Sequence, residues 1–204
     1  MRQKAAILCL VLGIAFLLAA LGLVCYNTWE SQSAQQSSQD ILVQIQNRQE
    51  PTEFSEDPYE DHVDAFDQAS KEMTVREIDG HEYVGYLSIP VLDRELPVMS
   101  QWTYAWLEIA PCRQYGATKT DDLVIAAHNY ASHFGRLSQL RPADLLTFTD
   151  MDGEVILYAV EVVDVLDPDA VDTVKNSDFD LVLYTCTYGG SSRIAVFCNR
   201  VILE

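Results

Sequence analysis

The sequence predicts a mostly β domain, built either as a closed barrel or as a sandwich. Short runs of apolar, β-branched and aromatic residues recur along the C-terminal part of the chain, separated by turns rich in Gly, Pro, Asp or Ser. Few stretches in this part have the periodicity of an amphipathic helix. Many short strands with such turns between them are typical of barrels and sandwiches. The expected strands cover residues 83–89, 95–99, 123–130, 145–148, 154–166, 181–185 and 194–198.

The chain begins with a short basic flank, residues 1–4, followed by 22 uncharged residues, 5–26, of which 12 are Leu, Ile, Val or Phe. As a helix this run is about 33 Å long, enough to cross a hydrocarbon layer of about 30 Å. A cleavable signal peptide is the alternative, but its apolar region usually has about 7–15 residues, so the length favours an uncleaved transmembrane anchor. Arg2 and Lys4 predict a cytoplasmic N-terminus, and hence a single-pass cell-membrane protein with its folded domain outside.

Residues 27–72 are expected to form an acidic and polar linker before a folded domain of residues 73–204. Residues 31–38 are rich in Ser and Gln, which is typical of a linker, and residues 40–47 have a mixed periodicity that fits a short helix. Residues 50–67 carry many acids and two prolines, a composition that disfavours a packed core.

The connections between the predicted strands have local signals of their own. Phe134, Leu137 and Leu140 stand at helical spacing, and Pro168 opens a stretch with several Asp residues. We therefore expect a short helix or a packed loop at residues 102–109, helical turns at residues 134–140 and 170–174, a hairpin turn at residues 150–153, and a loop over residues 167–180.

Charge and cysteine content exclude several classes of function. A formal charge of −18 argues against nucleic-acid binding, which needs clusters of Lys and Arg. Two of the five cysteines, Cys9 and Cys25, lie in the apolar run. The other three are Cys112, Cys186 and Cys198, an odd number that fits one free reactive thiol, with the other two either reduced or joined in a disulfide. The sequence has no Cys-x-x-Cys pattern, which disfavours an oxidoreductase.

Three residues at strand ends form a candidate catalytic site. Cys186 ends one predicted strand, Arg193 opens the next, and His128 lies at the end of the strand over residues 123–130. A cysteine at a strand end is usually an inert buried residue, but a thiol beside an imidazole or another cation becomes a nucleophile. His133 is the competing imidazole, and no Cys or His pair has zinc-finger spacing.

Three motifs in this part of the chain resemble the sortase family. LYTC, followed seven positions later by Arg193, resembles the sortase signature TLxTC…R. AAHNYASHFGRLSQL resembles the family's His segment, and YLSIP followed by LPV resembles its opening strand. The resemblance spans residues 84–204, with departures at Val182, where the family usually has Thr, and at Ala127, where Gly often precedes the His. It implies a closed β-barrel of about eight strands.

The resemblance implies a role for each residue of the candidate site. Cys186 is expected to be the nucleophile, and His128 the general acid that protonates the departing amine and later the base for the incoming one. Arg193 is expected to donate hydrogen bonds to the developing oxyanion. Thr185 is expected to orient the substrate carbonyl or to pack beneath the cysteine, and Asn129 to contact substrate or orient the imidazole.

The implied activity is that of a membrane-anchored cysteine transpeptidase, an enzyme of the cysteine endopeptidase class. Such enzymes cut an LPxTG-type sorting signal of a surface protein and pass the acyl group, through a thioester, to an amine of a cell-wall precursor or of another surface protein. The motifs favour a class B-like or a housekeeping subclass. They imply no cofactor, although some relatives bind calcium at acidic loops and this alternative stays open.

Two alternatives from other functional classes remain at this point. One is a non-catalytic, membrane-tethered β-domain that binds a peptide or a wall component. The other is a thiol hydrolase that releases peptides to water. Asp57-Pro58-Tyr59 has the Asp-Pro-aromatic form of the lid in pilus-building sortases, but an acidic linker often contains Asp-Pro by chance.

Overall fold

The computed structural model describes residues 2–48 and 72–202. The acidic stretch of residues 50–67, with Asp57-Pro58-Tyr59, lies outside the described residues. The strands are β1 (Arg76–Ile78), β2 (His81–Ile89), β3 (Arg94–Met99), β4 (Cys112–Tyr115), β5 (Leu123–Ala126), β6 (Leu145–Asp150), β7 (Val155–Leu166), β8 (Leu181–Cys186) and β9 (Arg193–Arg200). The helices are α1 (Arg2–Arg48), α3 (Tyr104–Leu107), α4 (Val171–Lys175) and the 3-10 turns η1 (Pro90–Leu92) and η2 (Leu137–Gln139).

The strands form one sheet that closes on itself. Their order is β1-β2-β3-β4-β5-β8-β9-β7-β6, and a further antiparallel pairing of β2 with β6 joins the two ends. Because β1 pairs only with β2, it lies outside the ring, and the other eight strands make a closed barrel. This confirms the predicted mostly β fold with a barrel of about eight strands and few short helices, and it removes the sandwich alternative.

The strands that carry the candidate site lie in the best buried part of the barrel wall. All four residues of β5 are buried, and so are the first three residues of β8. Strands buried on both faces read as continuous apolar runs, which is how these two appear in the sequence. Burial of each large apolar side chain contributes about 1.5–3 kcal/mol to the stability of the fold, so the core holds the ends of these strands firmly in position.

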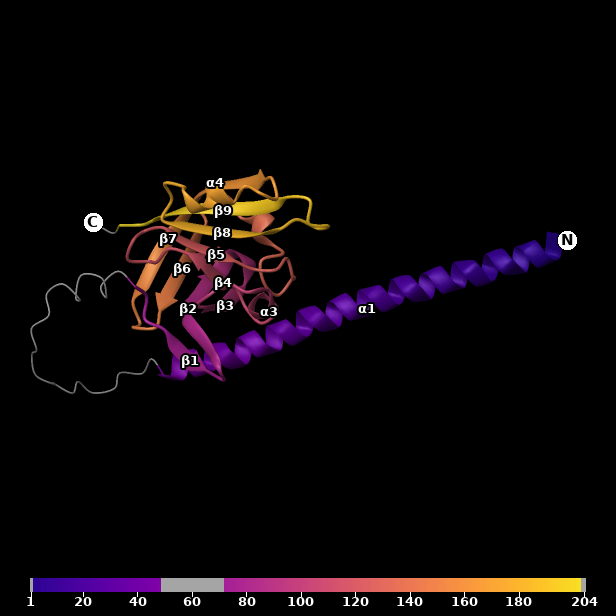
Figure 1. Cartoon of the computed structure of the whole chain (residues 1–204), viewed down its shortest axis with the longest axis horizontal. Helices are drawn as coiled ribbons and strands as arrows, with labels where there is room; N and C mark the ends of the chain where they lie inside the picture. Colours follow the sequence, from indigo (N-terminus) through magenta and orange to yellow (C-terminus); the bar gives the residue numbers. More distant parts are fainter. Residues whose placement is uncertain (1, 49–71, 203–204) are drawn as a thin grey trace, which may run out of the picture.

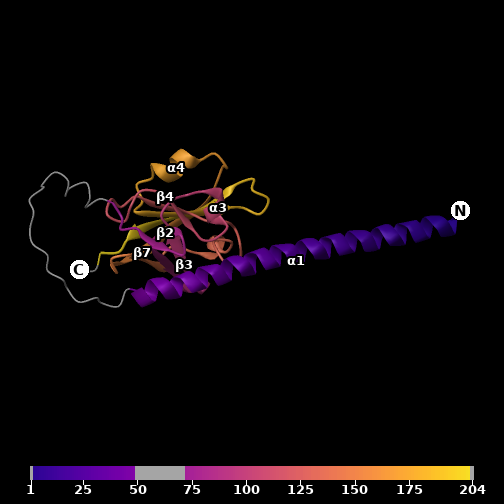
Figure 2. The same ribbon diagram turned by 60° about the horizontal axis from the view of Figure 1, so that its bottom comes forward.

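Helix α1 lies against the barrel with its C-terminal part and extends away from it with its N-terminal part (Figures 1 and 2). Residues 31–38, which the Ser- and Gln-rich composition assigned to the linker, are helical and continue α1. The buried positions of α1 have helical spacing, and they are Ala34, Ser38, Ile41, Leu42 and Ile45.

The docked part of α1 lies beside β3. Ile41 and Ile45 belong to the same apolar cluster as Tyr83 and Met99. The Ser38 hydroxyl donates a hydrogen bond of 3.1 Å to the Ile109 carbonyl. Within the described residues, no helix has the combined length and apolarity needed to cross a membrane.

Candidate active site

Cys186 and Arg193 face each other across two neighbouring strands. β8 and β9 are antiparallel, and the register pairs Cys186 directly with Arg193. The connecting turn is tight, because the Thr187 amide donates to the Ser192 carbonyl at 2.9 Å. Gly189 and Gly190, with φ of 85° and 76°, supply the left-handed backbone that this turn requires. The short turn therefore fixes the thiol and the guanidinium side by side.

His128 reaches the same place from the other side of β8. β5 and β8 are parallel, and the register pairs Ala126 with Tyr184. The pairing continues past the strand, since the Ala127 amide donates to the Tyr184 carbonyl at 3.2 Å. Two positions beyond the Ala126–Tyr184 pair, His128 stands level with Cys186 by the same register, and the next residue, Asn129, contacts the Thr187 carbonyl. The strand ends at Ala126, four residues earlier than predicted, so the imidazole is carried by the loop that follows β5.

Thr185 and Asn129 each join the segment around His128 to β8 or to the turn that follows it. Thr185 is buried, and its hydroxyl donates a hydrogen bond of 2.8 Å to the Ala127 carbonyl. Its side chain thus ties β8 to the backbone just before His128. The Asn129 side-chain amide donates to the Thr187 carbonyl at 3.3 Å, so it joins the His128 loop to the β8–β9 turn.

The Arg193 guanidinium is held partly by the turn that precedes it. Its Nη1 donates to the carbonyls of Gly190 and Ser192 at 3.2 and 3.1 Å. Since guanidinium has five N–H donors, the group retains donors for a ligand while these two bonds restrict its position. Burial raises the pKa of the neighbouring Tyr184 to about 12, and the positive charge of Arg193 opposes this shift. Cys186 acts on this pKa in the same direction as burial.

A pocket of about 230 Å³ opens beside Arg193. Aromatic and apolar side chains form its walls, from the segment before α3 and from the β7–β8 connection that contains α4. The residues in contact with it include Trp102, Tyr104, Gln114, Leu166, Pro168, Val174, Tyr184 and Arg193. The rings of Trp102 and Tyr104 meet edge to face, with centroids 4.8 Å apart. The sequence did not predict these two aromatic residues as part of the site, because apolar residues near a short helix are more often core.

Among the thiols of the barrel, Cys186 alone is partly exposed. Cys112 and Cys198 are buried and reduced, and burial raises the pKa of each to about 12. They belong to different apolar clusters, so the alternative of a Cys112–Cys198 disulfide is wrong. A buried thiol with a raised pKa stays protonated and inert near neutral pH, which leaves Cys186 as the candidate nucleophile of the domain.

The two histidines that compete for the catalytic role differ in accessibility. His128 is partly exposed beside Cys186, whereas His133 is buried with 1% of its surface exposed. A buried imidazole cannot meet a substrate amine, so geometry favours His128. The residues that the structure describes contain no group of three or more His, Cys, Asp or Glu side chains arranged to hold a metal ion.

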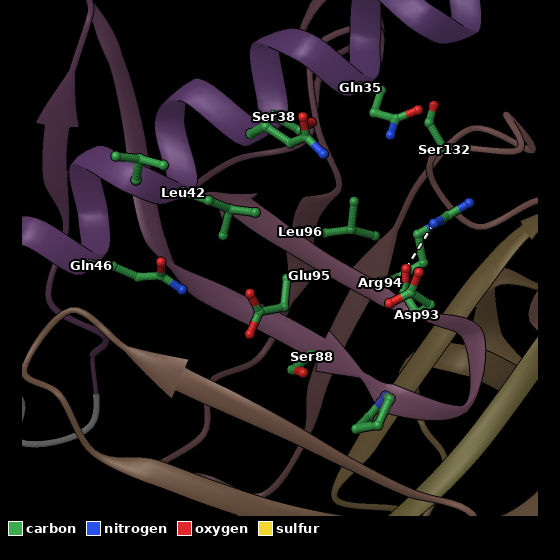
Figure 3. Close-up of a pocket in the computed structure, with 13 residues that line it drawn as sticks. Gln35, Ser38, Leu42, Gln46, Ser88, Asp93, Arg94, Glu95, Leu96 and Ser132 are labelled. Carbon is green, nitrogen blue, oxygen red and sulfur yellow. Dashed lines mark hydrogen bonds between the residues drawn. The ribbon is translucent and has the colours of Figure 1, made fainter.

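A wider groove of about 650 Å³ lies away from these residues, between α1 and β3 (Figure 3). Its walls include Gln35 and Ser38 of α1, Arg94 and Glu95 of β3, and Ser132 of the loop after His128. None of Cys186, His128 or Arg193 contacts it. The groove is therefore separate from the candidate chemistry, although it touches the loop that carries the imidazole.

Comparisons with known proteins place this geometry in context. The sortase-domain family model matches residues 87–201. Among solved structures, the chain is similar to sortase A from Corynebacterium diphtheriae, at 26% identity and a TM-score of 0.54 over 61% of this chain and 63% of that one. It is thus aligned over less than two thirds of that protein. A search of curated protein sequences found no match.

Two further solved structures are similar over a larger share of their length. Sortase C1 from Streptococcus agalactiae is 26% identical, with a TM-score of 0.53 over 63% of this chain and 72% of that one. Clostridium perfringens sortase C, solved with the C-terminal cell wall sorting motif, is 25% identical, with a TM-score of 0.52 over 59% of this chain and 71% of that one.

Proposed function

Because this chain belongs to the sortase family, we propose that it is a cysteine transpeptidase with Cys186, His128 and Arg193 as its catalytic residues. The observation that carries the proposal is the register around β8. One neighbouring strand sets Arg193 opposite Cys186, and the other leads His128 to the same strand end. A nucleophile, an acid/base and a cationic hydrogen-bond donor at one opening are the groups that acyl transfer through a thioester requires.

The first half of the reaction forms the thioester. The Cys186 thiolate attacks a peptide carbonyl, a C–S bond forms, and the carbonyl oxygen takes up the negative charge. Arg193 donates hydrogen bonds to this oxygen, and donors aimed at developing charge lower the barrier. The C–N bond then breaks as protonated His128 gives its proton to the departing amine.

The second half joins the acyl group to a new amine. The incoming amine attacks the thioester carbonyl while neutral His128 accepts its proton. The new C–N bond replaces the C–S bond, and the Cys186 thiolate leaves. No net oxidation occurs, and both the thiolate and the protonated imidazole are regenerated, so this chain's own residues balance the cycle.

The proposed substrates are surface proteins with an LPxTG-type sorting signal, and the proposed acceptors are amines of a cell-wall precursor or of another surface protein. The similar Clostridium perfringens sortase C was solved with a C-terminal cell wall sorting motif. In this chain the pocket beside Arg193 is lined partly by apolar side chains, including Trp102 and Pro168, which fits contact with apolar side chains of a bound peptide.

We further propose that residues 5–26 anchor the protein in the cell membrane, with the barrel outside. The run is uncharged, and its large apolar side chains between Leu10 and Val24 are exposed. From Tyr26 to the docked Ser38 the helix rises about 18 Å. The β8–β9 turn points to the side toward which the N-terminal part of α1 extends (Figures 1 and 2). This orientation suits substrates that are themselves held at the membrane, since tethering raises their local concentration.

The test uses the full chain in nanodiscs, a library of LPxTG-type peptides, and a set of amine donors. Mass spectrometry is expected to detect a thioester on Cys186 and a peptide joined to the amine, and Cys186→Ala is expected to form neither. Release of free acid in the presence of excess amine identifies the hydrolase alternative. Peptide binding that is equal in the wild type and Cys186→Ala, with no adduct across the library, identifies the non-catalytic alternative and overturns the proposal.

A further inference from the structure

The loop that follows His128 is wound into a fixed conformation. The Phe134 amide donates to the His128 carbonyl at 3.2 Å, and the amides of His133 and Gly135 donate to the Tyr130 carbonyl at 3.0 and 2.9 Å. A Cβ atom at Gly135 would lie 2.7 Å from that same carbonyl oxygen, so only glycine fits the turn. The backbone therefore sets where each ring of this loop lies.

Three rings of this loop pack in a row. The centroids of His128 and Tyr130 are 4.9 Å apart with an interplanar angle of 37°, and those of Tyr130 and His133 are 5.4 Å apart with an angle of 45°. Both distances are in the range of favourable ring contacts. The Tyr130 ring thus lies between a partly exposed imidazole and a buried one.

The buried imidazole is neutral near physiological pH. The pKa of His133 is lowered to about 4, mainly by burial and also by the charge of His128, while the Ile109 carbonyl opposes the shift. Within the described residues, neither ring nitrogen of His133 meets hydrogen-bond geometry. The His133 ring therefore acts on its neighbours through its flat shape and its packing against Tyr130. It adds no positive charge near His128.

The surrounding elements hold this ring row in place. Arg94 of β3 donates to the Ala131 carbonyl from Nε and Nη2 at 3.3 and 3.1 Å. Ser132 lies in the groove that Ser38 of α1 also lines (Figure 3). The Ile109 carbonyl beside His133 accepts the hydrogen bond from Ser38. Strand β3 and helix α1 thus support the side of the loop that is farther from His128.

We propose that His133 is a positioning residue, which holds the Tyr130 ring against His128 and so keeps the catalytic imidazole directed at Cys186. The inference rests on the proposed function for the role of His128. It assigns no contact with substrate to His133 itself. What matters is a flat, uncharged ring at this buried position, so phenylalanine is expected to replace it.

The experiment compares His133→Phe, His133→Leu and His133→Ala in the full-length protein. Misplacement of a catalytic group by about 1 Å costs about 100-fold in rate, so His133→Ala is expected to lose about tenfold to 100-fold in kcat with little change in KM. His133→Phe is expected to keep the wild-type kcat. His133→Leu fills the volume without a flat ring, and it is expected to fall between them even where His133→Ala fails to fold.

A double-mutant cycle tests whether His133 acts through Tyr130. Tyr130→Ala is expected to lower kcat as His133→Ala does, and the double variant is expected to be no slower than Tyr130→Ala alone, because residues in one contact chain are not additive. Two additive losses would show that His133 acts on its own and would overturn the proposal. So would a folded His133→Leu or His133→Ala variant with the wild-type kcat.

Two substrate-free readouts separate this proposal from the proposed function. These are the NMR titration of the His128 ring and the pH dependence of Cys186 alkylation by iodoacetamide. Both are expected to shift in His133→Ala and to return to wild type in His133→Phe. If the wild type joins no peptide, the proposed function fails while these readouts still decide the role of His133. A His128 titration that is the same in all folded variants overturns the positioning role.

Discussion

The Cα atoms of Cys186 and Arg193 are direct partners across the β8–β9 pair. In an antiparallel pair, the side chains of directly opposed residues lie on the same face, about 5 Å apart at Cβ. A thiol and a guanidinium at such positions share one opening whichever rotamers they adopt. The hairpin itself therefore aligns the proposed nucleophile with the donor that is expected to stabilise the oxyanion.

Replacement of Arg193 tests that alignment. Arg193→Ala is expected to lower kcat by about 100–1000-fold, the scale for loss of one oxyanion donor. Arg193→Lys keeps the charge but lacks the planar set of donors, so it is expected to recover only part of the loss. Steady-state kinetics with a sorting peptide and single-turnover thioester formation measure both. Arg141→Ala, at an exposed position remote from Cys186, is the control. Equal rates for Arg193→Ala and the control would refute the assigned role.

Thr185 is expected to matter for both stability and rate through its hydroxyl. Thr185→Val keeps the shape but removes the donor to the Ala127 carbonyl, and it leaves a buried acceptor unpaired. Such a loss costs about 1–3 kcal/mol in the free energy of unfolding. Because Ala127 precedes His128, kcat is expected to fall as well. Urea denaturation and peptide kinetics measure the two effects, and Thr185→Ser, which keeps the hydroxyl, is the control. A Thr185→Val variant as active and stable as Thr185→Ser would contradict the inference.

The docked face of α1 is expected to stabilise the barrel. Ile45 is 2% exposed in an apolar cluster with Tyr83 and Met99, so Ile45→Ala is expected to cost about 2–5 kcal/mol in the free energy of unfolding. Val43, 55% exposed on the same helix, is the matched control, and Val43→Ala is expected to have little effect. Urea denaturation followed by tryptophan fluorescence measures both. A soluble domain that begins near residue 73 would expose this cluster, so it is a poor choice for assays. Equal midpoints for the two variants would show that the helix only rests on the surface.

Much of the barrel could be predicted from the sequence, because its main strands are apolar runs with turn residues at their ends. β1 and β4 were missed, since REI and CRQY are short and mostly polar. The docking of α1 was missed because its buried positions are spread through a Ser- and Gln-rich stretch. Their partners lie on β2 and β3, far along the chain.

The candidate site divides in a similar way. Cys186 and Arg193 could be paired from the sequence, because a Gly- and Ser-rich turn joins their strands. The place of His128 depends on the parallel pairing of β5 with β8, which local patterns do not reveal. The aromatic wall beside Arg193 depends on the β7–β8 connection folding over residues more than 60 positions earlier, such as Trp102. The class B-like or housekeeping subclass stays a prediction.

Acid is expected to destabilise the fold through His133, independently of catalysis. Its pKa is lowered from 6.5 to about 4 by burial, so between these values the unfolded chain binds a proton that the folded chain does not. The contribution is full above pH 6.5 and is lost as the pH falls through about 4. The shift corresponds to about 3 kcal/mol. Urea midpoints of wild type and His133→Phe are expected to converge at pH 7 and to diverge at pH 4.5. His81→Phe, at a partly exposed position, is the control, and identical pH dependence in all three proteins would contradict the prediction.

Alkylation is expected to distinguish Cys186 from the buried thiols of the barrel. Burial raises the pKa of Cys112 and Cys198 from the ordinary 9.0 to about 12, so both stay protonated and shielded at pH 8. Iodoacetamide is expected to label Cys186 in the native protein, and to label the other two only in urea. Peptide mapping by mass spectrometry locates the label, with Cys186→Ser as the control. The same shifts predict that stability falls as the pH rises above 9.0, because thiols ionise in the unfolded chain before they can in the folded one. Removing both thiols, in Cys112→Ala/Cys198→Ala, is expected to flatten the loss between pH 8 and pH 10.5. Native labelling of Cys112 or Cys198 at the rate of Cys186 would show that the barrel opens, and it would remove the argument that one thiol alone is reactive.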